Sequence, residues 1–223
     1  MAIRVLIVDN QQLFTEALRN LLELEDDIEV VGEAYDGVTG LEKIAATRPD
    51  VAVVDLRMPG LNGIEVAQRV KNEVAPEVRI MILTATEEDE FLTRAVEVGV
   101  EGYLTKDIAM EVLAGAIRRV VAGETVVPPN RLKHLLRNLT QPDRRGTDAG
   151  AHMASYLTDR EKEVLSLLVA GKSNSAIGEA LYISSNTVRT HIQNILSKLS
   201  VHSKLEAVAF AIKHNIVEVE RAS

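Results

Sequence analysis

The first 125 residues alternate short apolar runs with segments whose apolar residues recur at helical spacing. A run such as Ile3–Val8 is apolar almost throughout, which is typical of a strand buried on both faces of a parallel sheet. In Gln11–Leu24 the leucines and alanines recur every three or four residues, which indicates a helix. Five such units favour an α/β fold, and we expect a doubly wound (βα)5 parallel sheet of order 2-1-3-4-5. The predicted strands are Ile3–Val8, Ile28–Ala34, Val51–Val54, Arg79–Leu83 and Gly102–Leu104, and the predicted helices are Gln11–Leu24, Val38–Thr47, Ile64–Val74, Glu88–Val98 and Ala109–Ala122.

From residue 156 onward the pattern is helical only. Thr158 and Glu161 have the spacing of a capping box at the start of a helix that ends at Gly171. Three further helices are expected, over Asn174–Leu181, from the N-cap Ser184 to Leu199, and over Ser203–Asn215. A short helix, a tight turn and a longer helix form a helix-turn-helix, so we expect an all-α four-helix domain of this kind.

The two patterns divide the chain into a first domain over residues 1–125 and a second over residues 156–223. Residues 126–155 between them form the predicted linker. Its part after residue 139 is polar, small and glycine-containing, and its candidate short helix covers Arg131–Leu139. Both domains are long enough to bury a hydrophobic core.

Composition and charge limit the classes of function. The chain has no cysteine, which excludes disulfides, thiolate zinc sites and thiol nucleophiles. Neither a signal peptide nor an apolar run long enough for a membrane is present, so we expect a cytoplasmic protein without membrane contact. Residues 1–125 carry 24 acidic and 12 basic residues, and residues 126–223 carry 9 and 13. This division suggests that a polyanion meets the second domain, although two differently solvated surfaces would give the same numbers.

Polar residues follow several strands of the predicted sheet at their carboxyl ends. Because these ends meet at one edge of a parallel sheet, the side chains should converge. Carboxylates with a neighbouring amide suit Mg²⁺, and a carboxylate beside Mg²⁺ can accept a phosphoryl group. A lysine and a hydroxyl could stabilise the same phosphoryl oxygens. Any one of these residues alone would more often be a cap or a solvated charge, but their coincidence at four strand ends favours a site. The candidates are Asp9, Asn10, Asp55, Thr84, Tyr103 and Lys106.

The segments around these residues resemble the receiver domain of two-component response regulators. The resemblance rests on Val8-Asp9-Asn10, Val54–Gly63 (VDLRMPGLNG), Leu83-Thr84-Ala85 and Gly102–Lys106 (GYLTK). It implies that Asp55 is the phosphoacceptor and receives its phosphoryl group from a sensor histidine kinase. It further implies Mg²⁺ held by Asp9, Asn10, Asp55 and the backbone carbonyl of Arg57, a switch pair of Thr84 and Tyr103, and Lys106 as counter-ion of the phosphate.

Asn10 departs from the family, which carries an acid at this position. A neutral amide should weaken Mg²⁺ binding, which leaves open an atypical regulator that is independent of phosphorylation or gated by another ligand. A phosphatase similar to the haloacid dehalogenases would also use a strand-end aspartate. It needs an acid two residues after the nucleophile, however, where this chain has Arg57.

The helix expected after Ser184 separates into an apolar and a polar face. The polar face carries arginine, asparagine and glutamine side chains, which match the hydrogen-bonding groups of base edges. The segment Leu157–Phe210 resembles the LuxR-type helix-turn-helix of the NarL/FixJ family, on motifs that include Leu157–Leu165 (LTDREKEVL) and Thr187–His191 (TVRTH). The resemblance implies a DNA-binding regulator rather than an enzyme, which acts on promoter DNA. It also implies a homodimer whose contacts are made by the last helix. Alternatively, this helix is simply the fourth helix of the domain core. It makes Arg189, Thr190 and Gln193 base readers and Ser184, Thr187, Lys198 and Lys204 phosphate contacts.

Overall fold

The chain forms two compact units, Met1–Pro128 and Pro129–Ser223, each with its own hydrophobic core. The computed structural model describes residues 2–85, 89–108, 110–127, 153, 155–201, 203–214 and 216–217, without the side chains of residues 89, 90 and 110. The predicted helix Arg131–Leu139 and most of the predicted linker lie outside these residues. Among the helices that the structure describes, none is long and apolar enough to cross a membrane.

The first unit is built on a sheet of five parallel strands in the order β2-β1-β3-β4-β5. This confirms the predicted fold class and strand order. All five strands begin at the residue that the pattern of apolar runs predicts, and three of them extend one residue further at the carboxyl end. The strands are β1 Ile3–Val8, β2 Ile28–Ala34, β3 Val51–Asp55, β4 Arg79–Thr84 and β5 Gly102–Thr105.

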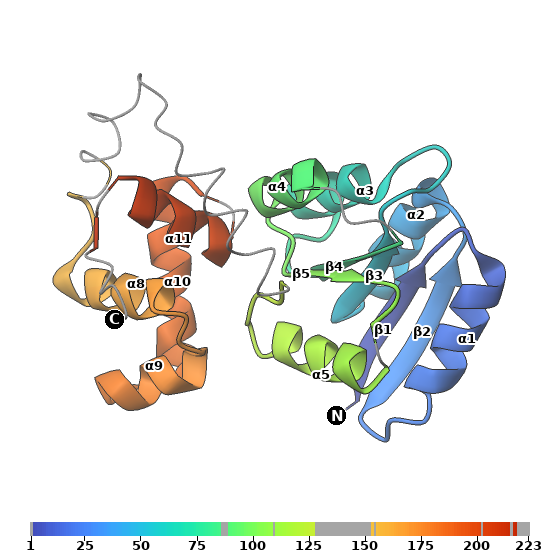
Figure 1. Cartoon of the computed structure of the whole chain (residues 1–223), viewed down its shortest axis with the longest axis horizontal. Helices are drawn as coiled ribbons and strands as arrows, with labels where there is room; N and C mark the ends of the chain where they lie inside the picture. The colour runs from blue at the N-terminus through green and yellow to red at the C-terminus, as the bar shows by residue number, and fades with distance from the viewer. Residues whose placement is uncertain are drawn as a thin grey trace. The chain divides into compact units, whose positions relative to one another are not determined.

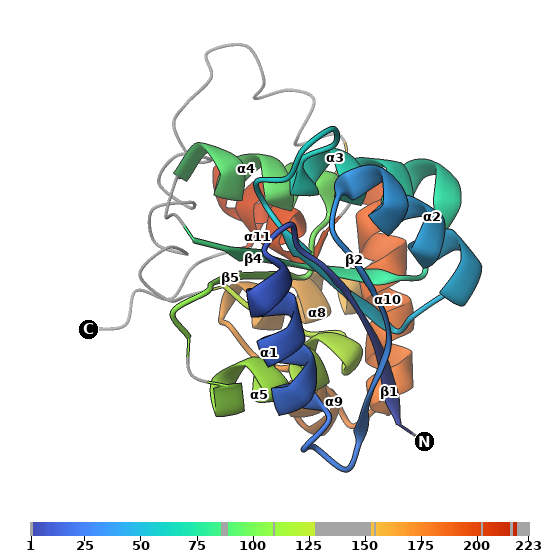
Figure 2. The same cartoon turned by 90° about the vertical axis from the view of Figure 1, so that its right-hand side faces the viewer.

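Helices cover both faces of this sheet, α1 and α5 on one face and α2, α3 and α4 on the other (Figure 2). The core on the first face joins leucine, isoleucine and valine side chains from α1 and α5 to those of the strands. A doubly wound fold holds its site at the carboxyl ends of the strands, between these two layers of helices. The helices are α1 Gln12–Leu22, α2 Gly37–Thr47, α3 Gly63–Arg69, α4 Asp89–Val98 and α5 Met110–Val121.

The helix predicted over Ile64–Val74 is two segments. After α3 the chain forms a π-helical turn, η1, over Val70–Val74, and the N–H of Ala75 donates to the carbonyl of Val70 at 3.0 Å. Pro76 follows, and the residue before a proline is driven out of helical conformation, so the helix ends here. Hydrophobic spacing alone does not distinguish a π-turn from an α-helix.

Gly63 allows α3 to begin directly against the end of β3. Its N–H donates to the carbonyl of Leu56 at 2.9 Å, and a Cβ atom at this position would lie only 2.4 Å from the carbonyl oxygen of Asp55. Asn62 caps the helix in a capping box with Glu65. The loop after Asp55 is therefore held by backbone contacts and a cap.

The described part of the second unit contains four helices around an apolar core (Figure 1). Thr158 and Glu161 form the predicted capping box, and Ser184 is the predicted N-cap, with its hydroxyl accepting from the N–H of Thr187. α10 packs against the three other helices of the unit. The helices are α8 Asp159–Val169, α9 Asn174–Leu181, α10 Ser185–Leu199 and α11 Lys204–Lys213.

Candidate functional site

Asp9, Asp55, Thr84 and Lys106 meet at the carboxyl edge of the sheet. The Lys106 ammonium lies 2.6 Å from Asp9 Oδ2 and 3.2 Å from Asp55 Oδ1, so one cation bridges acids from two strands. Asp9 and Asp55 are 2% and 5% exposed, and Thr84 is buried as well. The structure thus brings these four predicted residues together, while Asn10 and Arg57 lie exposed at the rim.

Backbone geometry holds the two acids in place. The N–H of Asp9 continues the β1–β2 ladder to Ala34, and its Oδ1 accepts from the N–H of Gln11 at 2.9 Å. Asp55 is the last residue of β3 and pairs in register with Leu83, the neighbour of Thr84. The N–H of Lys106 donates to the carbonyl of Thr84 at 2.8 Å, which fixes the start of the lysine side chain.

The site carries more negative than positive charge. Burial raises the pKa of Asp55, the charge of Asp9 raises it further, and the opposing effects of Lys106 and the Arg57 N–H do not compensate. One ammonium cannot neutralise two carboxylates, so the site favours an additional cation. Phe14 supports the lysine, since the ammonium lies 4.7 Å from its ring centroid. The sequence offers no signal for this contact, because the ring comes from α1.

The residues at this edge fit Mg²⁺. Among the described residues, no group of three or more histidine, cysteine or acidic side chains could hold a metal, so a site here relies on two carboxylates with further oxygen donors. Asp9 and Asp55 would supply the carboxylates of such a site, and Asn10 and Arg57 lie exposed at its rim. Mg²⁺ suits such a set, because it takes oxygen ligands and keeps several waters.

Tyr103 lies beside this group on β5. Its side chain is 4% exposed, its backbone pairs with Ile82 of β4, and its N–H donates to the carbonyl of Val126 at 2.9 Å. Thr84 and Tyr103 therefore sit on adjacent strands, both buried.

In the second unit, α10 presents a polar face free of acidic residues. Val188, Ile192, Ile195 and Leu199 are buried, and Leu196, which was predicted to lie on the same apolar face, is half-buried against the core. The side chains on the opposite side are exposed. They are Asn186, Thr187, Arg189, Thr190, Gln193, Asn194 and Ser197.

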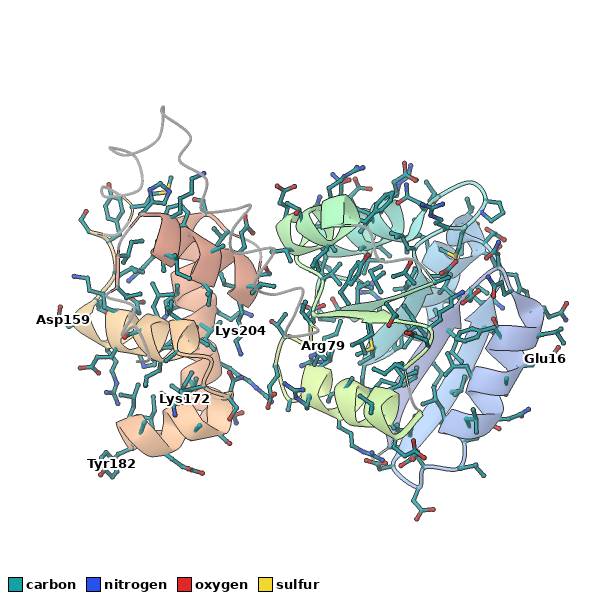
Figure 3. The ribbon with its side chains drawn as sticks, viewed as in Figure 1. Glu16, Arg79, Asp159, Lys172, Tyr182 and Lys204 are labelled. Carbon is teal, nitrogen blue, oxygen red and sulfur yellow. The ribbon has the colours of Figure 1, made fainter. Side chains whose placement is uncertain are left out.

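The turn before α10 is tight. The N–H of Ile183 donates to the carbonyl of Gly178 at 2.9 Å, and a Cβ atom on Gly178 would lie 2.7 Å from the Ile183 oxygen. Tyr182 takes the left-handed conformation with φ of 55°, and its side chain, 95% exposed, projects from the end of α9 (Figure 3). Gly178 therefore sets how closely α10 follows α9.

Several of the residues predicted to contact DNA make hydrogen bonds or ion pairs within the protein. The Ser184 and Thr187 hydroxyls hydrogen-bond each other at 2.8 Å, and Thr190 Oγ1 donates to a backbone carbonyl of α10. Lys204 Nζ donates to Asn174 Oδ1 at 2.9 Å, and Lys198 Nζ lies 2.7 Å from Glu161 Oε2. The sequence indicated Glu161 as a cap only, and the pair with Lys198 depends on how α10 packs on α8.

Both units match known families. Residues 5–118 match the response regulator receiver domain, and residues 155–211 match the luxR family of bacterial regulatory proteins. Two similar relatives are the transcriptional regulatory protein DegU of Brevibacillus brevis, 34% identical over 97% of this chain and 96% of its own length, and the response regulator protein VraR of Staphylococcus epidermidis, 34% identical over 98% of this chain and its own full length. The signal receiver domain of NarL from Mycobacterium tuberculosis is 35% identical, with a TM-score of 0.53 over 55% of this chain and 98% of that domain.

Proposed function

This chain belongs to the two-component response regulators that carry a luxR-family DNA-binding domain, and from that premise we propose that phosphorylation of Asp55 controls its binding to promoter DNA. It is a DNA-binding regulator of transcription and not an enzyme. Because such a regulator works where the bacterial chromosome lies, a cytoplasmic location is part of the proposal.

The observation that carries the proposal is the bridge of Lys106 between Asp9 and Asp55. An Asp55 oxygen would attack the phosphorus of a phosphohistidine on a sensor histidine kinase. The P–N bond breaks, an acyl phosphate forms on Asp55, and the histidine keeps the electron pair of the broken bond. Lys106 is placed to offset the charge on the transferred group. Bound Mg²⁺, held by Asp9, Asp55 and oxygens of Asn10 and Arg57, would offset the repulsion between the carboxylate and the incoming phosphoryl oxygens.

Thr84 and Tyr103 would transmit the change. The Thr84 hydroxyl can donate to a phosphoryl oxygen, which draws the end of β4 toward Asp55. Because Tyr103 is buried on the adjacent strand, its ring would repack with this movement. The surface around β5 then differs between the two states.

In the second unit, Arg189, Thr190 and Gln193 would read base edges from the exposed face of α10. Ser184, Thr187 and Lys204 would contact phosphates around it. Inside the protein, Lys204 Nζ donates to the amide oxygen of Asn174.

A second copy of the chain is proposed as partner in the active state. The family resemblance makes α11 the dimerisation helix, with Leu205, Val208, Ala209 and Ile212 as its apolar residues, but Leu205 and Ala209 are buried inside the unit. Of these four residues, Val208 and Ile212 are half-buried and are proposed for contacts with another copy. Dimers of this class read two half-sites on DNA.

Footprinting of the full-length protein tests the proposal. The probe is a duplex that the protein enriches from a randomised pool, and protection is compared with and without acetyl phosphate and Mg²⁺. We expect protection at lower protein concentration after phosphorylation. Equal footprints in both states would contradict phosphate control and favour the atypical regulator, for which the exposed, neutral Asn10 is the supporting observation.

A further inference from the structure

Lys198 lies on the side of α10 that faces α8, away from the proposed base-reading face. Successive residues of an α-helix are separated by about 100°. Lys198 therefore lies roughly opposite Arg189 around the helix axis, with the buried stripe of Val188 and Ile195 between them. The partner of Lys198 confirms this direction, because its ammonium contacts Glu161 of α8.

Glu161 is a buried carboxylate with all its contacts inside the unit. Its side chain is 4% exposed. Oε2 accepts from the N–H of Thr158 at 2.7 Å and from the Thr158 hydroxyl at 2.9 Å. Lys198 Nζ lies 2.9 Å from Oε1 and 2.7 Å from Oε2. The same carboxylate thus caps α8 and holds α10.

Withdrawal of Lys198 from this contact is unfavourable. If the Lys198 ammonium moved to a DNA phosphate, the buried Glu161 carboxylate would lose its ionic partner. Loss of the partner of a buried charge is strongly destabilising. Lys204 differs in this respect, because its ammonium donates to the neutral amide oxygen of Asn174. The two lysines that the resemblance makes phosphate contacts are therefore not equivalent.

We propose that Glu161 and Lys198 are positioning residues that set the orientation of the DNA-reading helix α10 on α8, and that Lys198 does not contact a DNA phosphate. The proposal rests on the assignment of α10 as the reading helix. The pair joins the N-terminal cap of α8 to the last turn of α10, and a shift at this point would change the angle at which Arg189 and Gln193 approach the bases.

Salt dependence of binding separates a phosphate contact from a positioning role. The full-length Lys198→Met variant keeps the apolar stem and removes the charge, and it is titrated with a duplex that the native protein enriches from a randomised pool. Each lost phosphate contact reduces the slope of log K against log[salt] by about 0.9. We expect an unchanged slope, and a reduction of about 0.9 would overturn the proposal.

Discrimination between the enriched duplex and a random-sequence duplex tests the positioning role. Loss of one good base contact reduces discrimination by roughly fivefold or more, and we expect such a loss in both Lys198→Met and Glu161→Gln. Glutamine retains the capping box at α8. Lys162→Met is the matched control, because Lys162 lies 3.9 Å from Asp159 in an exposed pair, and it should leave discrimination unchanged.

The double variant Glu161→Gln with Lys198→Met separates positioning from stability. The double variant has no unpaired buried charge at residue 161, so its melting temperature should exceed that of Lys198→Met. We expect its discrimination to remain low. If the double variant regains both discrimination and melting temperature, the pair has a structural role only and the proposal is wrong. The same conclusion follows if Lys198→Met discriminates between the two duplexes as well as the native protein does. Arg189→Ala on the same probe tests the reading face independently, so failure of the proposed function is recognised separately.

Discussion

The ammonium of Lys106, one residue beyond β5, lies 2.6 Å from Oδ2 of Asp9, one residue beyond β1. Two strands, β3 and β4, stand between β1 and β5 in the sheet. The lysine reaches across them along the carboxyl edge and contacts Asp55 on the way, at 3.2 Å. This contact draws the proposed phosphoacceptor, the metal-site acid and the counter-ion into one group, and each part of it can be tested.

Asp55→Asn should abolish incorporation of phosphate from acetyl phosphate, because the amide oxygen cannot form a stable acyl phosphate. The fold should persist, since Lys106 keeps Asp9 as its partner and one buried charge is removed. Incorporation is followed by mass spectrometry of the intact protein. Asp107→Asn, an exposed acid beside the same lysine, is the control and should be phosphorylated normally. Phosphate on the Asp55→Asn protein would show that another residue is the acceptor.

Asn10→Asp should strengthen Mg²⁺ binding. Asn10 is exposed, so the added charge acts through solvent-like surroundings, and we expect a decrease in Kd on the order of tenfold. Calorimetric titration measures the affinity, and the rate of phosphorylation by acetyl phosphate should rise with it. Asn20→Asp, exposed on α1, is the matched control. If native protein and Asn10→Asp bind Mg²⁺ equally, the amide is not part of the metal site.

Gly63→Ala should lower the free energy of unfolding by about 1–3 kcal/mol, because the new methyl group meets the backbone of Asp55 and the loop must shift. The displacement should also slow phosphorylation. Gly115→Ala on α5 is the control, since nothing lies within 4 Å of its Cβ position and alanine favours a helix by about 1 kcal/mol. Urea unfolding compares the two. A normal stability for Gly63→Ala would mean that close approach does not position the Asp55 loop.

Arg189→Ala should weaken binding to the enriched duplex by about 1–3 kcal/mol and relax the preference at one base pair. The reason is that alanine lacks the guanidinium N–H donors that Arg189 presents on the exposed face of α10. Selection from a randomised pool by native and variant proteins measures the preference. Lys162→Ala removes a positive charge from α8 and should leave the preference unchanged. If Arg189→Ala and the native protein select the same base pairs, the assignment of this face of α10 to the DNA groove is wrong.

The stability of the second unit should fall at acidic pH through Glu161. Burial acts to raise the pKa of Glu161, but hydrogen bonds from Lys198 and Thr158 outweigh it, so the pKa lies below its ordinary value of 4.5. The charged carboxylate therefore contributes stability above that value, and the contribution is lost as the pH falls through the lowered pKa. Hydrogen exchange of amides in α8 and α10 should show native protein more protected than Glu161→Gln at neutral pH, with the difference shrinking in acid. A constant difference across this range would contradict the role of the charge.

Much of the fold follows from local pattern. Continuous apolar runs and helical spacing predicted the five strands and their connecting helices, because burial on two faces or on one stripe leaves a trace in the order of residues. Caps such as Thr158 and Ser184 were predicted because their partners lie three residues away. The π-turn η1 was missed, since its hydrogen bonds shift by one residue without a change in hydrophobic spacing.

The sequence by itself therefore determined the elements, their order and which polar residues stand at the strand ends of this protein. Only the tertiary structure decided that Lys106 bridges Asp9 and Asp55 over the ring of Phe14, and that Lys198 of α10 pairs with Glu161 of α8. The physical reason is distance along the chain. A contact within a few residues is limited by local geometry, whereas a contact between distant segments depends on how whole helices and strands pack against one another.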